Sequence, residues 1–203
     1  MMRDALLVDF GGVLTTNVFD AFADFCRAEG LAPDTVRDRF MTDPAARELL
    51  EELEMGRIGE VEFEPRFAEL LGVEPADRLI DRLFAGMVPE EAMLDAVRTA
   101  RRAGIRTGLL SNSWGQQRYE RETFPELFDA VVISGEVGIR KPDPEIYALA
   151  AERLGREPER VVFVDDLPGN LKPARAIGMA TVLHRDAETT LRELEEHLGV
   201  SLR

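Results

Sequence analysis

The chain has 203 residues, of which 45% are apolar and 32% charged, and its formal net charge is −14. This balance is typical of a globular protein of one or two domains and excludes a disordered tail, a collagen and a coiled-coil rod. An acidic surface repels nucleic-acid backbones and anionic lipids, so we expect neither nucleic acid nor a membrane as a partner.

The first predicted element is a short buried strand, Ala5–Val8, which is too short for the apolar core of a signal peptide. The single cysteine, Cys26, excludes an internal disulfide and any metal site built from several cysteines. We therefore expect a cytoplasmic protein.

The segment after the first strand has helical patterns and no convincing strand. Five helices are expected there, over Val18–Glu29, Pro33–Phe40, Pro44–Glu54, Glu60–Leu71 and Ala76–Phe84. This arrangement predicts a helical cap domain at 15–88, inserted into a core domain made of 1–14 and 89–203.

The rest of the chain alternates between helical patterns and short apolar runs. Helices are expected over Pro89–Ala103, Pro144–Leu154, Leu171–Ile177 and Ala187–Leu198, the first three stopping at a glycine. Further buried strands are expected at Arg106–Leu110, Ala130–Ile133, Val161–Val164 and Ala180–Leu183. The pattern predicts an α/β fold with a Rossmann-like, doubly wound parallel sheet.

Polar side chains follow three of these strands. Asp9 follows the first strand, Ser111 and Asn112 follow the second, and Asp165 and Asp166 come after the run that begins at Val161. Ligands of open parallel sheets bind beyond the carboxyl ends of the strands, so three carboxylates and a hydroxyl converge if these strands are neighbours. Such carboxylates raise one another's pKa or recruit a hard cation such as Mg²⁺. Taken singly, each is equally typical of a helix cap or a turn.

The lysine content singles out one further residue. Only two of the 25 basic residues are lysines, Lys141 and Lys172. Where arginine serves as the general positive charge, a lysine indicates a need for its compact ammonium group. The alternative for Lys141 is a solvated side chain before a proline turn.

Four segments resemble, in the same order, the four motifs of the haloacid dehalogenase-like (HAD) hydrolases. They are Asp9-Phe10-Gly11-Gly12-Val13-Leu14, Leu110-Ser111-Asn112, Gly138-Ile139-Arg140-Lys141-Pro142-Asp143-Pro144, and Val164-Asp165-Asp166 followed by Asn170. The insertion after the first motif lies where this family places a type-one helical cap, so the resemblance covers essentially the whole chain. The segment 163–175 is most similar to the branch that holds the N-terminal phosphatase domain of soluble epoxide hydrolases.

The resemblance implies a Mg²⁺-dependent phosphatase that acts on a small phosphomonoester. Asp9 would be the nucleophile, forming an aspartyl-phosphate that water then hydrolyses. Mg²⁺ would be held by Asp9, by the backbone carbonyl of Gly11, by Asp166, and by Asp165 directly or through water. The sequence leaves the oligomeric state open, so both a monomer and a homodimer are possible.

The other motif residues would bind the transferring group. Ser111 and the backbone around Asn112 would contact the phosphoryl oxygens, and Lys141 would neutralise both the nucleophile and the phosphoryl group. Asn170 would orient metal-bound water. Trp114, which follows the second motif, either packs in an apolar core or lines the pocket.

The first motif departs from the phosphatase pattern at Gly11. The usual motif has an aspartate there, two residues after the nucleophile, which protonates the leaving group. The enzyme is then restricted to good leaving groups, or takes the proton from the substrate or from a cap residue. Arg57 and Glu60 are candidates for such a residue by position alone.

Two other functions remain open at this point. One is a haloacid dehalogenase, which shares the nucleophilic aspartate and the lysine, lacks the second aspartate and needs no metal. The other is a binding or regulatory protein that keeps the scaffold without catalysis. The acidic pair Asp165-Asp166 favours the phosphatase over the dehalogenase, and the presence of all the other motif residues argues against a protein that has lost catalysis.

Overall fold

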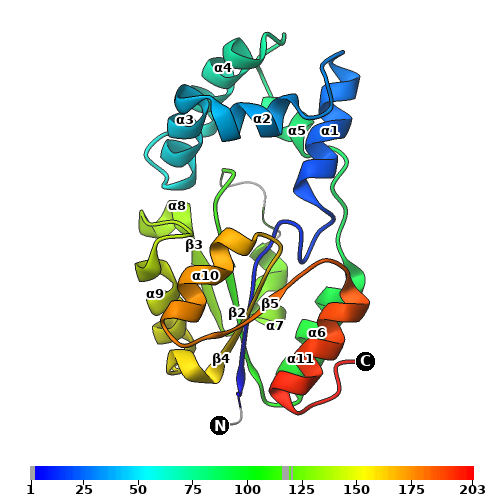
Figure 1. Cartoon of the computed structure of the whole chain (residues 1–203), viewed down its shortest axis with the longest axis vertical. Helices are drawn as coiled ribbons and strands as arrows, with labels where there is room; N and C mark the ends of the chain where they lie inside the picture. The colour runs from blue at the N-terminus through cyan, green and yellow to red at the C-terminus, as the bar shows by residue number, and fades with distance from the viewer. Residues whose placement is uncertain (1–2, 116–118, 120) are drawn as a thin grey trace.

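The structure is a computed structural model that describes residues 3–115, 119 and 121–203. A parallel sheet of five strands forms its centre (Figure 1), in the order β3-β2-β1-β4-β5. The strands are β1 (Ala5–Val8), β2 (Arg106–Ser111), β3 (Ala130–Ile133), β4 (Val161–Asp165) and β5 (Ala180–Leu183). This arrangement confirms the predicted α/β class, and β2, β1 and β4 are neighbours as the site hypothesis requires.

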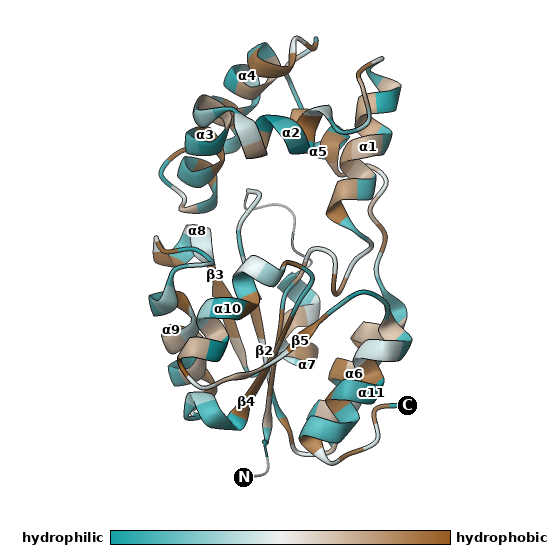
Figure 2. Cartoon of the chain, in the orientation of Figure 1, coloured by the Kyte–Doolittle hydropathy of each residue, from teal (hydrophilic) through white to brown (hydrophobic). Residues whose placement is uncertain are grey.

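Helices cover both faces of the sheet. Leu6 and Val8 of β1 pack on one face, while Ala5 and Leu7 pack on the other, because successive side chains of a strand alternate. The first face is covered by α6 (Glu91–Arg102), α7 (Phe124–Leu127) and α11 (Ala187–Leu198). The second face is covered by α9 (Pro144–Leu154) and α10 (Pro168–Ala176). Hydrophobic strands thus lie between helices whose outer surfaces are largely hydrophilic (Figure 2).

Two differences from the predicted elements concern the site. Helix α10 begins at Pro168, three residues before the predicted start, because proline needs no hydrogen-bond acceptor in a first helical turn. Asn170 therefore lies in that turn. Four short elements were not predicted from the sequence: the helices α7 and α8 (Ser134–Val137), and the single-turn 3₁₀ helices Arg121–Thr123 and Pro158–Arg160.

The segment between β1 and α6 folds into five helices beyond the carboxyl ends of the strands (Figure 1). They are α1 (Val18–Ala28), α2 (Thr35–Thr42), α3 (Pro44–Glu54), α4 (Glu60–Leu71) and α5 (Leu79–Leu83), which we call the helical layer. The layer has its own apolar cluster, separate from the two clusters on the sheet. None of the helices in the described ranges is long and apolar enough to cross a membrane.

The chain passes between the sheet and the helical layer twice, and the two passages lie side by side. Thr15 and Pro89 form an isolated antiparallel bridge. The amide of Thr16 donates to the carbonyl of Val88 at 2.9 Å, and that of Glu90 donates to Leu14 at 2.9 Å. The outgoing and returning segments are thus hydrogen-bonded to each other where they leave the core.

Candidate active site

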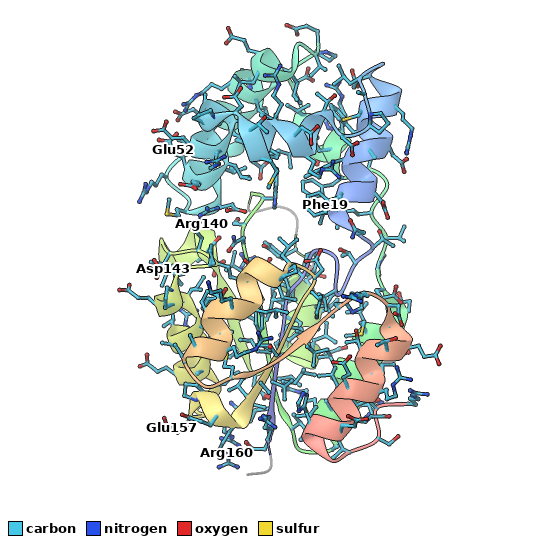
Figure 3. The ribbon with its side chains drawn as sticks, viewed as in Figure 1. Phe19, Glu52, Arg140, Asp143, Glu157 and Arg160 are labelled. Carbon is cyan, nitrogen blue, oxygen red and sulfur yellow. The ribbon has the colours of Figure 1, made fainter. Side chains whose placement is uncertain are left out.

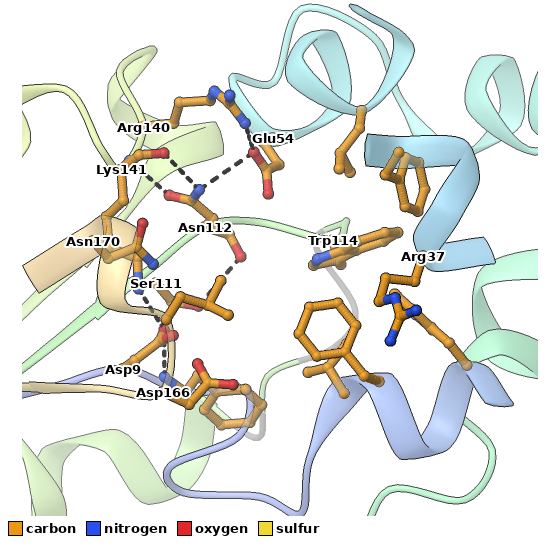
Figure 4. A pocket seen from close by; sticks show the side chains of 18 of the residues that line it. Asp9, Arg37, Glu54, Ser111, Asn112, Trp114, Arg140, Lys141, Asp166 and Asn170 are labelled. Atoms are coloured by element: carbon orange, nitrogen blue, oxygen red, sulfur yellow. Dashed lines mark hydrogen bonds and ion pairs between the residues drawn. The ribbon is translucent and has the colours of Figure 1, made fainter. Parts of the chain in front are cut away.

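The three carboxylates predicted to converge do meet at the carboxyl edge of the sheet. Because Val8 pairs with Val164 in register, Asp9 and Asp165 leave adjacent strands at the same level. One oxygen from each of Asp9, Asp165 and Asp166 lies within 4.8 Å of the others. Figure 4 shows Asp9 and Asp166 side by side at the base of a pocket.

Lys141 supplies the positive charge of this cluster. Its Nζ lies 2.8 Å from Oδ1 of Asp9 and 2.7 Å from Oδ2 of Asp165, and the residue is only 2% exposed. Burial alone would lower the pKa of this lysine, but the carboxylates of Asp165 and Asp9 raise it above the usual range. Lys141 is therefore a buried, permanently charged ammonium and not a solvated turn residue.

The two neighbouring aspartates differ in their surroundings. Asp165 is fully buried and accepts hydrogen bonds from the side chain of Asn170 at 3.0 Å and the amide of Leu167 at 2.8 Å. Asp166 is partly exposed and faces the first loop, where Gly12 has a φ of 75° and leaves no room for a Cβ against the Asp166 carboxylate. Asp166 is thus the freer carboxylate of the pair.

The electrostatics of the cluster suit a divalent cation. Burial raises the pKa of Asp9 to about 8, with Asp165 and Asp166 adding to the effect against the opposing charge of Lys141. Burial and Asp165 likewise raise the pKa of Asp166 to about 6. Three carboxylates around a single ammonium carry excess negative charge, and an oxygen-only ligand set fits a hard divalent ion such as Mg²⁺.

The residues predicted at the end of β2 lie beside this cluster. The Ser111 hydroxyl is 2.9 Å from the phenol of Tyr119, which packs edge-on to Phe10. The Asn112 side chain bonds the backbone of Lys141 twice, donating to its carbonyl at 3.0 Å and accepting from its amide at 2.8 Å. Asn112 therefore fixes the loop that carries Lys141.

A cavity of about 370 Å³ opens between the sheet edge and the helical layer. We call Asp9, Ser111, Lys141 and Asp166, which line the cavity, together with Asp165 buried beneath them, the floor. The opposite side is mostly aromatic, and we call Phe22, Phe40, Phe84 and Trp114 the aromatic wall. Trp114 comes from the loop after β2, and its ring centroid lies 5.0–5.7 Å from those of the three phenylalanines. Both alternatives for Trp114 hold, since it packs among these rings and lines the cavity.

The sequence patterns missed one acidic residue of this cavity, Glu54, the last residue of α3. Its carboxylate pairs with Arg140 and accepts a hydrogen bond from Asn112 at 3.3 Å, while its backbone carbonyl accepts from the Ser134 hydroxyl. It therefore ties the helical layer to the loop that carries Lys141. The spacing could have located it: Glu54 lies four residues after Leu50, which also lines the cavity, and residues four apart share one side of a helix.

Arg57 and Glu60, the two candidates named from sequence position, lie elsewhere. They line a neighbouring cavity together with Arg121 and Glu136. Neither residue lines the cavity that contains Asp9. The prediction that one of them supplies the proton that Gly11 cannot give is therefore wrong.

Known proteins carry recognisable similarity to this chain. A relative from Sus scrofa, bifunctional epoxide hydrolase 2, is 44% identical over 117 residues, covering 54% of this chain and 21% of that protein. Glyceraldehyde 3-phosphate phosphatase of Methanopyrus kandleri is 32% identical over 134 residues, 58% of either chain. The chain thus spans about a fifth to somewhat over half the length of these relatives.

A solved structure shares the fold. A HAD-family enzyme of Bacteroides thetaiotaomicron, in complex with magnesium and inorganic phosphate, superposes with a TM-score of 0.68 at 22% identity, over 91% of this chain and 95% of that one. The family model for haloacid dehalogenase-like hydrolases matches residues 3–178. The resemblance seen in the four motifs is confirmed, including the similarity to the epoxide hydrolase branch: the chain belongs to the haloacid dehalogenase-like hydrolases.

Proposed function

We propose that this chain is a Mg²⁺-dependent phosphatase that hydrolyses a small phosphomonoester through an aspartyl-phosphate on Asp9. The observation that carries the proposal is the meeting of Asp9, Asp165 and Asp166 with the buried ammonium of Lys141. The named phosphatase among the relatives and the neighbour with bound magnesium and phosphate support the same chemistry.

Asp9 is arranged to act as a nucleophile. Its Oδ1 accepts hydrogen bonds from the Phe10 amide at 2.7 Å and from Lys141, and these bonds hold the carboxylate in one orientation. The second oxygen, Oδ2, attacks phosphorus as the bond to the leaving oxygen breaks. Water then hydrolyses the aspartyl-phosphate, releasing inorganic phosphate and restoring Asp9.

The other residues of the floor bind and orient the phosphoryl group. Lys141 neutralises its oxygens, and Ser111 with the backbone around Asn112 donates hydrogen bonds to them. Asp9, Asp166 and the Gly11 carbonyl would hold the Mg²⁺, with Asp165 contributing directly or through water. When bound, the ion would offset negative charge on the phosphoryl oxygens.

We also propose that 15–88 acts as a cap on a core made of 1–14 and 89–203. The paired passages at Thr15 and Pro89 support this division, since they are the two covalent connections between the layers. Closure of the cap would exclude water from the pocket during transfer.

A substrate panel tests the proposal and its main competitor. Phosphorylated metabolites and 2-haloacids are incubated with the protein, with Mg²⁺ and with chelator. We expect phosphate release that stops when chelator is added. Halide release that persists in chelator would instead establish a dehalogenase, the function that the absence of an acid at Gly11 favours. Inactivity on every compound would favour a binding protein.

A further inference from the structure

We propose that Glu54 is the general acid of this enzyme, supplying from the helical layer the proton that Gly11 cannot. The inference rests on the proposed phosphatase function and adds a catalytic residue to it. Three acidic residues line the cavity within the described part of the chain, Asp9, Glu54 and Asp166. Asp9 and Asp166 belong to the acidic cluster at the sheet edge. Glu54 is the one of the three that comes from the helical layer.

The direction of phosphoryl transfer requires a proton on that side. Attacking and leaving oxygens lie roughly in line through phosphorus. Asp9 attacks from the sheet edge, so the leaving oxygen faces the helical layer, where α3 ends at Glu54. Figure 4 shows one carboxylate oxygen of Glu54 bonded to its neighbours and the other directed into the pocket.

The hydrogen bonds of Glu54 leave that second oxygen available. Within the described residues, the donors from Asn112 and Arg140 both reach Oε2. Once Glu54 has given up its proton, both donors stabilise the carboxylate that remains, because a hydrogen bond to an ionised oxygen is stronger than one to a neutral oxygen. Oε1 is the atom that carries the proton.

Burial, and not the neighbouring charges, favours a protonated Glu54 in the resting enzyme. Arg140 is shared between two carboxylates, Glu54 and Glu51, the latter at 2.9 Å. The side chain of Glu51 is 39% exposed and that of Glu54 only 8%, so Glu54 is the more deeply buried of the two carboxylates. Burial raises the pKa of Glu54 above its usual range, against the opposing charges of Arg140 and Lys141. Its place at the carboxyl end of α3 acts in the same direction.

The proposed step balances as follows. The bond between Oδ2 of Asp9 and phosphorus forms while the bond from phosphorus to the leaving oxygen breaks. The proton on Oε1 of Glu54 passes to the leaving oxygen, which departs as an alcohol. In the second half-reaction, water attacks phosphorus and gives its proton to the Glu54 carboxylate while the bond from phosphorus to Oδ2 of Asp9 breaks. Inorganic phosphate leaves, and both the Glu54 acid and the Asp9 carboxylate are restored.

The test is Glu54→Gln, which keeps the size of the side chain and its acceptor oxygen but cannot give a proton. Its rates are compared on an alkyl phosphate and on 4-nitrophenyl phosphate, whose leaving group needs little protonation. General acid catalysis is worth about 10²–10⁴ in rate. We expect a loss of about 10²-fold or more on the alkyl ester and less than about fivefold on the aryl ester.

Glu52→Gln is the matched control on the same helix. Glu52 pairs with Arg66 at 3.4 Å and does not line the cavity, and Figure 3 shows it at the outer edge of the helical layer. We expect this variant to match the wild type on both esters. Circular dichroism and thermal melting establish that both variants are folded.

The triple variant Gly11→Asp/Val18→Ala/Glu54→Gln separates proton donation from a merely structural role, and Val18→Ala makes room for the new side chain, whose Cβ would otherwise lie 2.9 Å from Cγ2 of Val18. An acid placed at position 11 rescues alkyl phosphate hydrolysis only if a missing proton is the defect in Glu54→Gln. Equal losses on both esters, or no rescue by Gly11→Asp, would overturn the assignment. A wild-type protein that hydrolyses neither ester would instead overturn the proposed phosphatase function.

Discussion

The floor and the aromatic wall face each other across one cavity, but they are held in different ways. Floor side chains are fixed by charged hydrogen bonds, such as those of Lys141 to Asp9 and Asp165 at 2.8 and 2.7 Å. The aromatic wall is held by packing, with the rings of Phe40 and Trp114 5.7 Å apart. Directed bonds fix individual atoms, whereas packing fixes a shape. Changes on the floor should therefore alter the chemistry, and changes around the wall should alter substrate preference.

Asp9→Asn is expected to have the largest effect. An amide cannot form the acyl phosphate, so we expect turnover to fall to the assay background. Asparagine has nearly the same shape as aspartate, and thermal melting should show that the variant is folded. Phosphate release by rigorously purified Asp9→Asn protein would refute the mechanism.

Lys141→Met is expected to damage both chemistry and stability. The variant leaves Asp9 and Asp165 buried without their cation, which typically costs about 3–5 kcal/mol of unfolding free energy. We expect kcat to fall by about 10²–10³, the usual value of one stabilising group of this kind. Urea denaturation and steady-state kinetics measure the two effects.

Lys172→Met is the control for that variant, because Lys172 is the other lysine of the chain and is exposed on α10. We expect its unfolding free energy to change by less than about 0.5 kcal/mol. If both variants lost equal stability, the pairing of Lys141 with the carboxylates would not be the cause.

Mg²⁺ should stabilise the metal-free protein, and more so as the pH rises. At a concentration of 100 times Kd, binding adds about 2.7 kcal/mol, and each kcal/mol raises Tm by about 2–4 °C in a protein of this size. The raised pKa values of Asp9, about 8, and Asp166, about 6, mean that protons compete with the ion at pH 6 and much less at pH 8. Thermal melts should show a larger shift at pH 8.

The same pKa values set the behaviour of the metal-free protein. The folded state holds protons on Asp9 and Asp166 that the unfolded state releases near pH 4. Stability from these groups is therefore lost as the pH rises from about 4 to about 8. Asp166→Asn should reduce this slope and weaken the Mg²⁺ shift, and an unchanged Mg²⁺ shift would place the ion elsewhere.

Gly11→Asp should have a smaller effect, a rise of about two- to tenfold in kcat/KM for alkyl phosphates. This is well below the full value of a general acid, about 10²–10⁴, because Glu54 already supplies the proton. A Cβ at position 11 would lie 2.9 Å from Cγ2 of Val18, so Val18→Ala in the same protein makes room for it. Gly11→Ala with Val18→Ala is the control. A flat response would mean that the proton is not limiting.

Met41→Ala is expected to have the smallest effect. Met41 lines the cavity beside the aromatic wall and is 68% exposed, so its removal should change stability by less than about 0.5 kcal/mol. We expect KM values to change from one phosphate ester to another while kcat stays the same. A fall in kcat common to all esters would contradict the separation between floor and wall.

The floor could be predicted from sequence because each of its residues follows a strand or lies in a short motif. Apolar runs located the strands to within one residue, and Asp9, Ser111 and Asp165 lie at their carboxyl ends. The side chain of Asn112 was harder to predict, because its bonds to Lys141 join segments 29 residues apart. Nothing in the local sequence specifies such a pairing.

The helices of the helical layer could be predicted from the sequence, but the residues that they present to the cavity could not. The bounds of α3 and α4 matched the predicted ranges, since proline, glycine and apolar spacing mark them. Which face of α3 meets the pocket depends on packing between helices. That packing brings Glu54 to the cavity while Arg57 and Glu60 line another one, although all three lie within seven residues.

The paired passages at Thr15 and Pro89 have a consequence for how such a protein diversifies. Because the insert leaves and re-enters the sheet at hydrogen-bonded neighbours, its two ends already meet. An insert of any length or shape whose ends are equally close can be accommodated there without redirecting a strand. Asp9 and its ammonium partner Lys141 can thus be inherited intact while the helices above them are replaced.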